Sequence, residues 1–183
     1  MSDEQVIRYC APTMANIKTA NLFSGMFESY QEMIASVRRL NIRLKDKGIR
    51  ILPLRFTEGR GLIYVYRPGR LSRDLQNGKA CRLLKACGYP DFDQNICIRR
   101  LISRLNEKGD FPHEIGLFLG YPPEDVDGFI NNKAACKYCG VWKVYDNVET
   151  AKKLFARYQK CTDIYRKQWR EGKSMERLTV AVK

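Results

Sequence analysis

The sequence predicts an α+β fold, in which a small, mainly antiparallel sheet of about four strands is covered by helices in a single domain, residues 1–183. Runs of β-forming residues occur without regular alternation with helices, which argues against a doubly wound parallel sheet. Between these runs lie long segments whose apolar residues recur every three or four positions, as one face of a helix requires. A chain of 183 residues is long enough to bury a hydrophobic core.

The amino-terminal part is expected to contain a short helix and then a long one. Thr13 can cap the first helix, which places Cys10 just before its start. The segment Glu28–Lys47 has apolar residues at helical spacing and basic residues in its last turns, and Gly48 ends it.

A hairpin is expected next. Ile49–Phe56 and Leu62–Tyr66 are rich in β-forming residues and are separated by a glycine-containing stretch, so we expect two antiparallel strands joined by a longer loop. Pro53 has no N–H to donate to a neighbouring strand, which places its strand at the edge of the sheet or at a bulge.

The second half is predicted to be mainly helical. We expect helices over Ser72–Gln76, Lys79–Cys87, Asn95–Lys108 and Val148–Glu171. Two further β-forming runs, Val141–Tyr145 and Leu178–Val182, read as strands.

The stretch Phe111–Ile130 is the main candidate for a functional site, because it contains the only histidine of the chain, His113, beside Glu114. Its apolar residues predict two short helices, which Pro122 and Pro123 separate. Such a helix–break–helix segment suits the wall of a ligand site, and it equally suits a buried structural elbow.

The net charge of +13 is the strongest global feature. It favours attraction to an acidic protein, to nucleic acid or to an anionic ligand, although a solvated surface rich in lysine and arginine explains it equally well. Neither a run of membrane-spanning length nor a secretion leader is evident, so we expect a cytoplasmic protein. Seven cysteines at irregular spacing suit reduced thiols better than a disulfide framework.

Three stretches together resemble a known family: CAPTMANIKTANLF, FPHEIGLFLGYPPEDVDGFI and VWKVYDNVETAKKLFARYQKCTDIY. They are similar to an uncharacterised bacterial domain-of-unknown-function family, number 3793, from Cys10 to the carboxyl-terminal LTVAV. The resemblance implies no activity, cofactor or catalytic residue. It suggests a flavodoxin-like electron carrier as an acidic partner to test.

A thiol site is one hypothesis. A cysteine just before a helix lies at the positive end of the helix dipole, which favours the nucleophilic thiolate, so Cys10 is a candidate nucleophile. His113 would be its base, and Glu114 would orient the imidazole ring. Heme or iron binding through Cys10 or His113 is a further alternative. The simpler interpretation makes Cys10 a small buried apolar residue and His113 a helix cap.

An anion site is a second hypothesis. Arg67, Arg70, Ser72 and Arg73 follow a predicted strand and enter a helix, where free N–H groups and guanidinium groups could bind a phosphate or carboxylate. A solvated turn whose arginines pair with acidic residues is an equally good interpretation.

Cys136 and Cys139 are the last candidates, as a C-x-x-C pair in the loop Asn131–Gly140. The spacing suits a redox dithiol or half of a zinc site, but no second pair of ligands accompanies it. An incidental reduced pair is the simpler interpretation.

Two functions remain open at the level of sequence. The composition favours a basic binding protein for an acidic partner or an anionic ligand, and the basic residues of Val148–Glu171 could follow a nucleic-acid backbone. The alternative is a thiol-dependent enzyme that uses Cys10 and His113.

Overall fold

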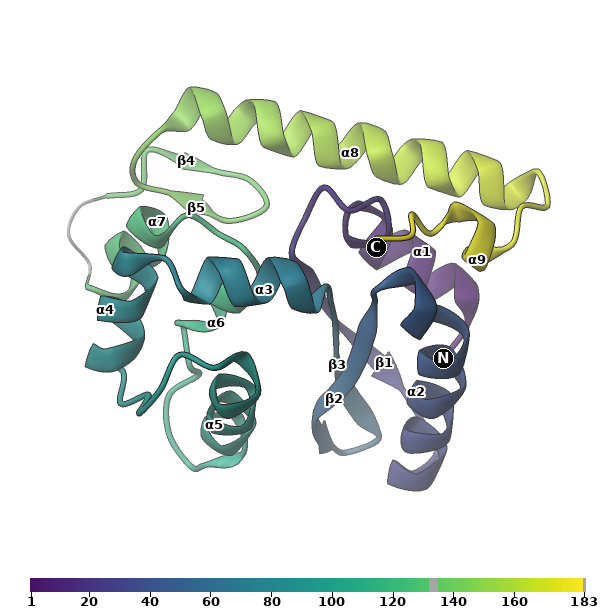
Figure 1. Ribbon diagram of the computed structural model, residues 1–183, viewed down its shortest axis with the longest axis horizontal. Coiled ribbons are helices and arrows are strands. Elements are labelled where there is room, and N and C mark those ends of the chain that lie inside the picture. Colours follow the sequence, from purple (N-terminus) through teal and green to yellow (C-terminus); the bar gives the residue numbers. More distant parts are fainter. Residues whose placement is uncertain (132–134, 183) are drawn as a thin grey trace. The chain divides into compact units, whose positions relative to one another are not determined.

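The computed structural model describes residues 1–131 and 135–182, and it confirms the α+β class (Figure 1). The chain forms two compact units. The first contains Met1–Pro68 and Tyr158–Lys183, and the second contains Gly69–Arg157. The expected single domain over residues 1–183 stays a prediction. Of the helices within the described residues, none is both long enough and apolar enough to cross a lipid bilayer.

The first unit is built on a three-stranded antiparallel sheet in the order β1-β3-β2. Its strands are β1 (Ala20–Met26), β2 (Arg50–Thr57) and β3 (Arg60–Tyr66). Helices α1 (Asp3–Met14) and α2 (Tyr30–Leu44) pack against this sheet and form the main core with it (Figure 1). The short helices η1 (Lys45–Lys47) and α9 (Met175–Leu178) complete the unit.

The β2–β3 hairpin confirms the sequence prediction in most respects. Pro53 lies on an edge strand, and the register shifts between Pro53 and Arg55, so both of its expected effects are present. The connection is shorter than expected. Glu58 and Gly59 form a two-residue turn with φ of 51° and 73°, the left-handed values that a tight hairpin turn requires.

The amino-terminal helix prediction was wrong. Helix α1 ends at Met14, close to where a helix was expected to begin. It starts after Ser2, whose side chain accepts from the backbone N–H of Gln5 while the Gln5 side chain accepts from the backbone N–H of Ser2. This reciprocal capping satisfies two free N–H groups at the helix start. The following strand, β1, pairs with β3 some forty residues away, which local helical spacing does not reveal.

The second unit is mainly helical. It contains most of α3 (Pro68–Leu75), together with α4 (Gly78–Ala86), α5 (Gln94–Asn106), α6 (Ile115–Phe118), α7 (Pro123–Ile130) and a two-stranded sheet of β4 (Tyr138–Cys139) and β5 (Lys143–Val144). Helix α8 (Val148–Arg170) begins in this unit and continues into the first.

Most helix predictions in this half are confirmed to within a few residues, whereas the final strand is wrong. The segment Leu178–Val182 begins with the last residue of α9 and continues as irregular chain. It is held by Val180, whose N–H donates to the carbonyl of Met14. Val180 and Val182 are exposed, and the described part of this segment joins no sheet.

Candidate functional site

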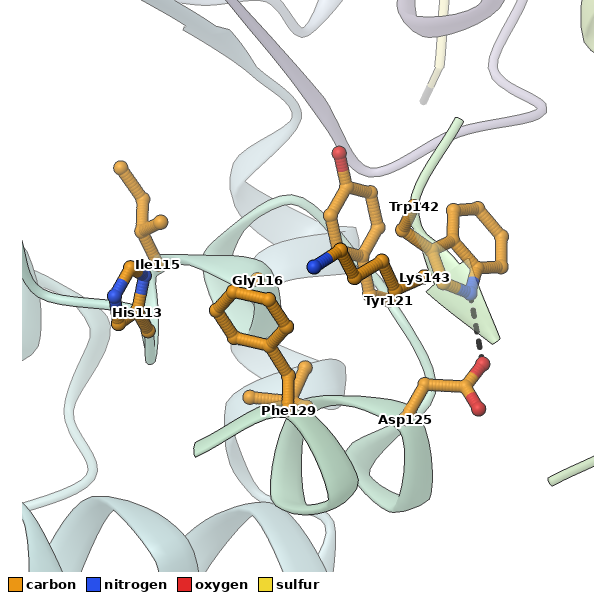
Figure 2. Close-up of a pocket in the computed structure, with 9 residues that line it drawn as sticks. His113, Ile115, Gly116, Tyr121, Asp125, Phe129, Trp142 and Lys143 are labelled. Carbon is orange, nitrogen blue, oxygen red and sulfur yellow. Dashed lines mark hydrogen bonds between the residues drawn. The ribbon is translucent and has the colours of Figure 1, made fainter. Parts of the chain in front are cut away.

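A cavity of about 210 Å3 lies within the second unit, between α6, α7 and the β4–β5 hairpin (Figure 2). Its lining is mostly apolar and aromatic: His113, Ile115, Gly116, Tyr121, Asp125, Val126, Phe129, Trp142 and Lys143. The predicted helix–break–helix segment therefore contributes most of the wall, and the hairpin supplies the rest.

Local sequence explains how α6 and α7 approach each other. Pro122 and Pro123 stop the first helix and start the second, where the missing N–H of proline costs nothing. Gly116 allows the close contact, because a Cβ atom there would lie 2.8 Å from Val126 Cγ2 and 3.1 Å from Tyr121 Cδ2. A larger residue at this position would force the two helices apart and deform the cavity.

Asp125 attaches the hairpin to α7. Its side chain is 3% exposed, and its carboxylate accepts three hydrogen bonds: from Trp142 Nε1 at 2.7 Å, from Tyr145 N at 2.7 Å and from Asp146 N at 3.0 Å. A buried carboxylate needs such donors to offset its lost hydration. Asp125 is thus a structural acceptor that positions Trp142 on the cavity wall.

Aromatic rings continue from this wall in close contact. Tyr121 and Trp142 stack with centroids 4.7 Å apart, and Trp142 meets Phe155 edge to face at 4.5 Å. On the opposite part of the lining, His113 meets Phe129 edge to face at 4.8 Å. Contacting rings limit one another's movement, so the lining presents fixed flat surfaces.

Two exposed side chains bring polar hydrogen-bond donors to this cavity, His113 and Lys143. The Lys143 ammonium nitrogen lies 5.1 Å from the centroid of the Phe129 ring. In the described part of the chain, neither the His113 ring nor the Lys143 ammonium takes part in a hydrogen bond or an ion pair; both side chains contact aromatic rings. Because both are exposed, the cavity opens to solvent on their side.

A family model covers nearly the whole of this architecture. The model described as "Protein of unknown function (DUF3793)" matches residues 6–179. The chain belongs to this family. No curated protein and no solved structure matches it. Membership confirms the resemblance found in the sequence and assigns no activity, so the chemistry of this DUF3793 member must be argued from its own residues.

Glu114, the expected partner of His113, has other partners. Its carboxylate is 2% exposed, lies 2.6 Å from Arg104 Nε and accepts a hydrogen bond from the Tyr89 hydroxyl at 3.0 Å. Burial and the nearby Glu114 carboxylate raise the pKa of Tyr89, which keeps its donor proton in place. The geometry makes Glu114 a structural anion at the start of α6.

Cys10 lies in the third turn of α1, and its expected position before a helix start was wrong. The thiol is fully buried in the core of the first unit. Burial raises the pKa of Cys10 far above its usual range, although the charge of Lys18 opposes the rise. Cys10 and His113 belong to different units, so their pairing in one site stays a prediction. Burial therefore disfavours the Cys10 thiolate that the thiol-enzyme hypothesis requires.

Arg67, the first predicted anion ligand, has a structural role. It is 2% exposed and donates to four backbone carbonyls, of Thr13, Met14, Lys47 and Val180, at 2.7–2.9 Å. Its guanidinium group joins α1, the end of η1 and the carboxyl-terminal segment of the first unit, which leaves it poorly placed to bind an anion.

The other predicted anion ligands, Arg70, Ser72 and Arg73, lie on α3, in the second unit. Arg73 Nε donates to the carbonyl of Gly69, within the same helix. Arg67 belongs to the first unit and these three residues to the second, and their joint anion site stays a prediction.

Cys136 and Cys139 are both exposed and are not joined in a disulfide. Cys139 belongs to β4, so a strand now occupies part of the predicted loop Asn131–Gly140, of which residues 132–134 lie outside the described residues. Within residues 1–131 and 135–182, no three or more histidine, cysteine, aspartate or glutamate side chains gather as metal ligands would. A redox role for the pair stays a prediction.

Sequence reasoning identified His113 but missed most of the cavity around it. Tyr121 and Phe129 were visible as aromatic residues in the singled-out stretch. Trp142 and Lys143 carried no such signal, because they come from a hairpin that follows in the chain and is attached through Asp125.

Proposed function

We propose that this protein is a binding protein for a small, flat and largely apolar molecule, which occupies the cavity formed by α6, α7 and the β4–β5 hairpin. The observation that carries the proposal is the ring-lined cavity, whose walls include Tyr121, Phe129 and Trp142. Concave, mostly apolar surfaces with a few polar groups are typical of small-molecule sites.

The size of the cavity limits the ligand. Sites for drug-sized molecules measure roughly 300–1,000 Å3, whereas this cavity measures about 210 Å3. The proposed ligand therefore has one or two rings. Edge-to-face and offset contacts with the lining rings would favour a planar aromatic body over an aliphatic chain of equal volume.

Binding without catalysis suits the chemistry of the lining. Among the described residues that form it, there is no serine, threonine or cysteine to act as a nucleophile. The acidic group there, Asp125, already accepts three hydrogen bonds and is poorly placed to act as a general base. The described lining thus offers neither a hydroxyl or thiol nucleophile nor a free carboxylate base, which favours a receptor over an enzyme that needs such groups.

A titration with naphthalene derivatives tests the proposal, using the quenching of tryptophan fluorescence as the readout. We expect saturable binding by the wild-type protein and at least a tenfold weaker affinity in Phe129→Ala, which removes the ring that His113 and Lys143 both contact.

Phe111→Ala is the matched control. Phe111 lies near the same histidine, with centroids 5.9 Å apart, but it is 42% exposed and does not line the cavity. Binding should survive this change. Equal affinities of wild type and Phe129→Ala, or no saturable binding at all, would contradict the proposal.

Docking to an acidic partner is a second candidate function. It is favoured by seven exposed basic side chains on one helix, α8: Lys152, Lys153, Arg157, Lys160, Arg166, Lys167 and Arg170. A flavodoxin-like protein or a nucleic acid supplies the complementary charge. Such association should weaken steeply between low and physiological salt, and an affinity that is independent of salt would argue against it.

A further inference from the structure

The cavity lining includes two charged side chains, Asp125 and Lys143, and they differ in whether a ligand can pair with them. Asp125 is buried, and its carboxylate already accepts from three donors. Lys143 is exposed, and its ammonium makes no ion pair or hydrogen bond in the described part of the chain. Among the described lining residues, a ligand in this cavity therefore meets an available positive charge, that of Lys143, and a negative charge that is already engaged, that of Asp125.

The donor groups gather around a single ring. The Lys143 ammonium nitrogen is 5.1 Å from the Phe129 centroid, and the His113 ring centroid is 4.8 Å from it. Figure 2 shows the Lys143 ammonium directed toward Phe129 and away from the Asp125 carboxylate. A polar group of a ligand that lies against Phe129 would thus come within reach of both donors.

The protein holds Lys143 in this position through its backbone. Lys143 pairs with Cys139 in the β4–β5 sheet. The residue before it, Trp142, is fixed by its hydrogen bond to Asp125. With the backbone anchored, less conformational freedom is lost when the ammonium group binds a ligand.

We infer that the ligand of this cavity is an aromatic carboxylate. Its ring lies against Phe129, Tyr121 and Trp142, and its carboxylate accepts hydrogen bonds from the Lys143 ammonium and from an N–H of His113. The inference rests on the proposed function, which describes the shape of the ligand, and it specifies in addition that the ligand is negatively charged. The strongly positive chain, with a net charge of +13, adds a general attraction for an anion.

Other ligand charges fit the same groups less well. An amine would face Lys143 and would find its natural partner, Asp125, already bonded to Trp142, Tyr145 and Asp146. A phosphate ester carries up to two negative charges, and arginine groups or clustered backbone N–H groups usually bind it. One ammonium and one imidazole match the single charge of a carboxylate.

Two pairs of probes with equal shape and different charge test the inference. The first pair is 2-naphthoate and 2-naphthamide, and the second, smaller pair is benzoate and benzamide. Each is titrated by calorimetry into the full chain at pH 7.5 and low salt. We expect the carboxylate of at least one pair to bind about tenfold more tightly than its amide, the order of effect of one charge-assisted contact at a partly exposed site.

The variant Lys143→Met identifies the charge responsible. It should bring the affinity for the carboxylate down to that for the amide and leave the affinity for the amide unchanged. Lys153→Met is the matched control, because Lys153 is an exposed lysine of the same unit that does not line the cavity. It should leave all affinities unchanged, and circular dichroism should show both variants folded.

The possible results separate the two proposals. If an amide binds as tightly as its carboxylate, or if Lys143→Met leaves the preference for the carboxylate intact, the inference is wrong while the proposed function stands. If neither pair binds at millimolar concentration, both are wrong. A preference for the carboxylate that only Lys143→Met removes supports both.

Discussion

Arg67 in the first unit and Lys143 in the second are both cations, yet the structure uses them in opposite ways. Arg67 is buried and donates to four backbone carbonyls. Lys143 is exposed at an apolar cavity and contacts a ring. A cation is available to a ligand only when the fold leaves it without protein acceptors, and sequence position does not reveal this.

Removal of Arg67 gives the largest effect that the comparison predicts. Arg67→Met would remove two buried hydrogen bonds from a charged donor, to the carbonyls of Thr13 and Met14, and each such bond is worth about 1.5–3 kcal/mol. The two carbonyls would keep only their backbone donors, the N–H groups of Asn16 and Val180. We expect a loss of about 4 kcal/mol in the free energy of unfolding, measured by urea denaturation.

Two other variants make this result interpretable. Arg67→Lys keeps the charge but lacks the planar fork of donors, so it should recover part of the loss. Lys143→Met should change stability by less than about 0.5 kcal/mol, as an exposed substitution does. If the Arg67 and Lys143 variants lost equal stability, the contrast between the two cations would be wrong.

Lys18 extends the comparison to pH. It is buried in the first unit and donates to the carbonyl of Ala20, and burial lowers its pKa to about 8. Between about pH 8 and its ordinary value near 10.5, the unfolded chain binds more protons at this position than the folded chain does. The Lys18 contribution to stability therefore rises with pH across this window, by up to about 3 kcal/mol.

The difference in unfolding free energy between wild type and Lys18→Met isolates this contribution. The difference should shift in favour of wild type as the pH rises from 8 to 10.5. The Cys10 thiol, whose pKa burial raises, acts in the opposite direction above about pH 9, but it is present in both proteins. A difference that stays flat with pH would show that Lys18 is not held in a poorly hydrated site.

Asp125→Asn should destabilise the protein less than the changes at Arg67 and Lys18, and it should also affect the cavity directly. An amide cannot accept from Trp142 Nε1 and from both backbone N–H groups as a carboxylate does, so we expect a loss of about 2 kcal/mol in urea denaturation. Binding of naphthalene derivatives should weaken as well, because Trp142 loses its anchor. Unchanged binding would contradict the positioning role of Asp125.

Local signals predicted much of the fold. The β2–β3 hairpin, the edge position of Pro53 and the long helix α8 follow from strand propensity, proline chemistry and helical spacing. The errors arose where contacts with distant parts of the chain determine the secondary structure. Strand β1 exists because it pairs with β3, and Thr179–Val182 is irregular chain in which the Val180 N–H bonds to the end of α1.

The candidate site shows the same division. His113 and the proline break were recognisable because one histidine stands in an apolar, proline-punctuated stretch. The role of Glu114 was misjudged because its partners, Arg104 and Tyr89, come from earlier segments. No local sequence signal marks Lys143, because only the fold brings it to Phe129.

The most direct test of the ligand cavity is the amide and indole NMR spectrum of the ¹⁵N-labelled chain during a titration with 2-naphthoate. The chain has two tryptophans, Trp142 in the cavity wall and Trp169 in α8, and Trp169→Phe assigns their indole signals. The account predicts a saturable shift of the Trp142 signal and a stationary Trp169 signal. A stationary Trp142 signal at millimolar 2-naphthoate, or a shift of Trp169 alone, would contradict it.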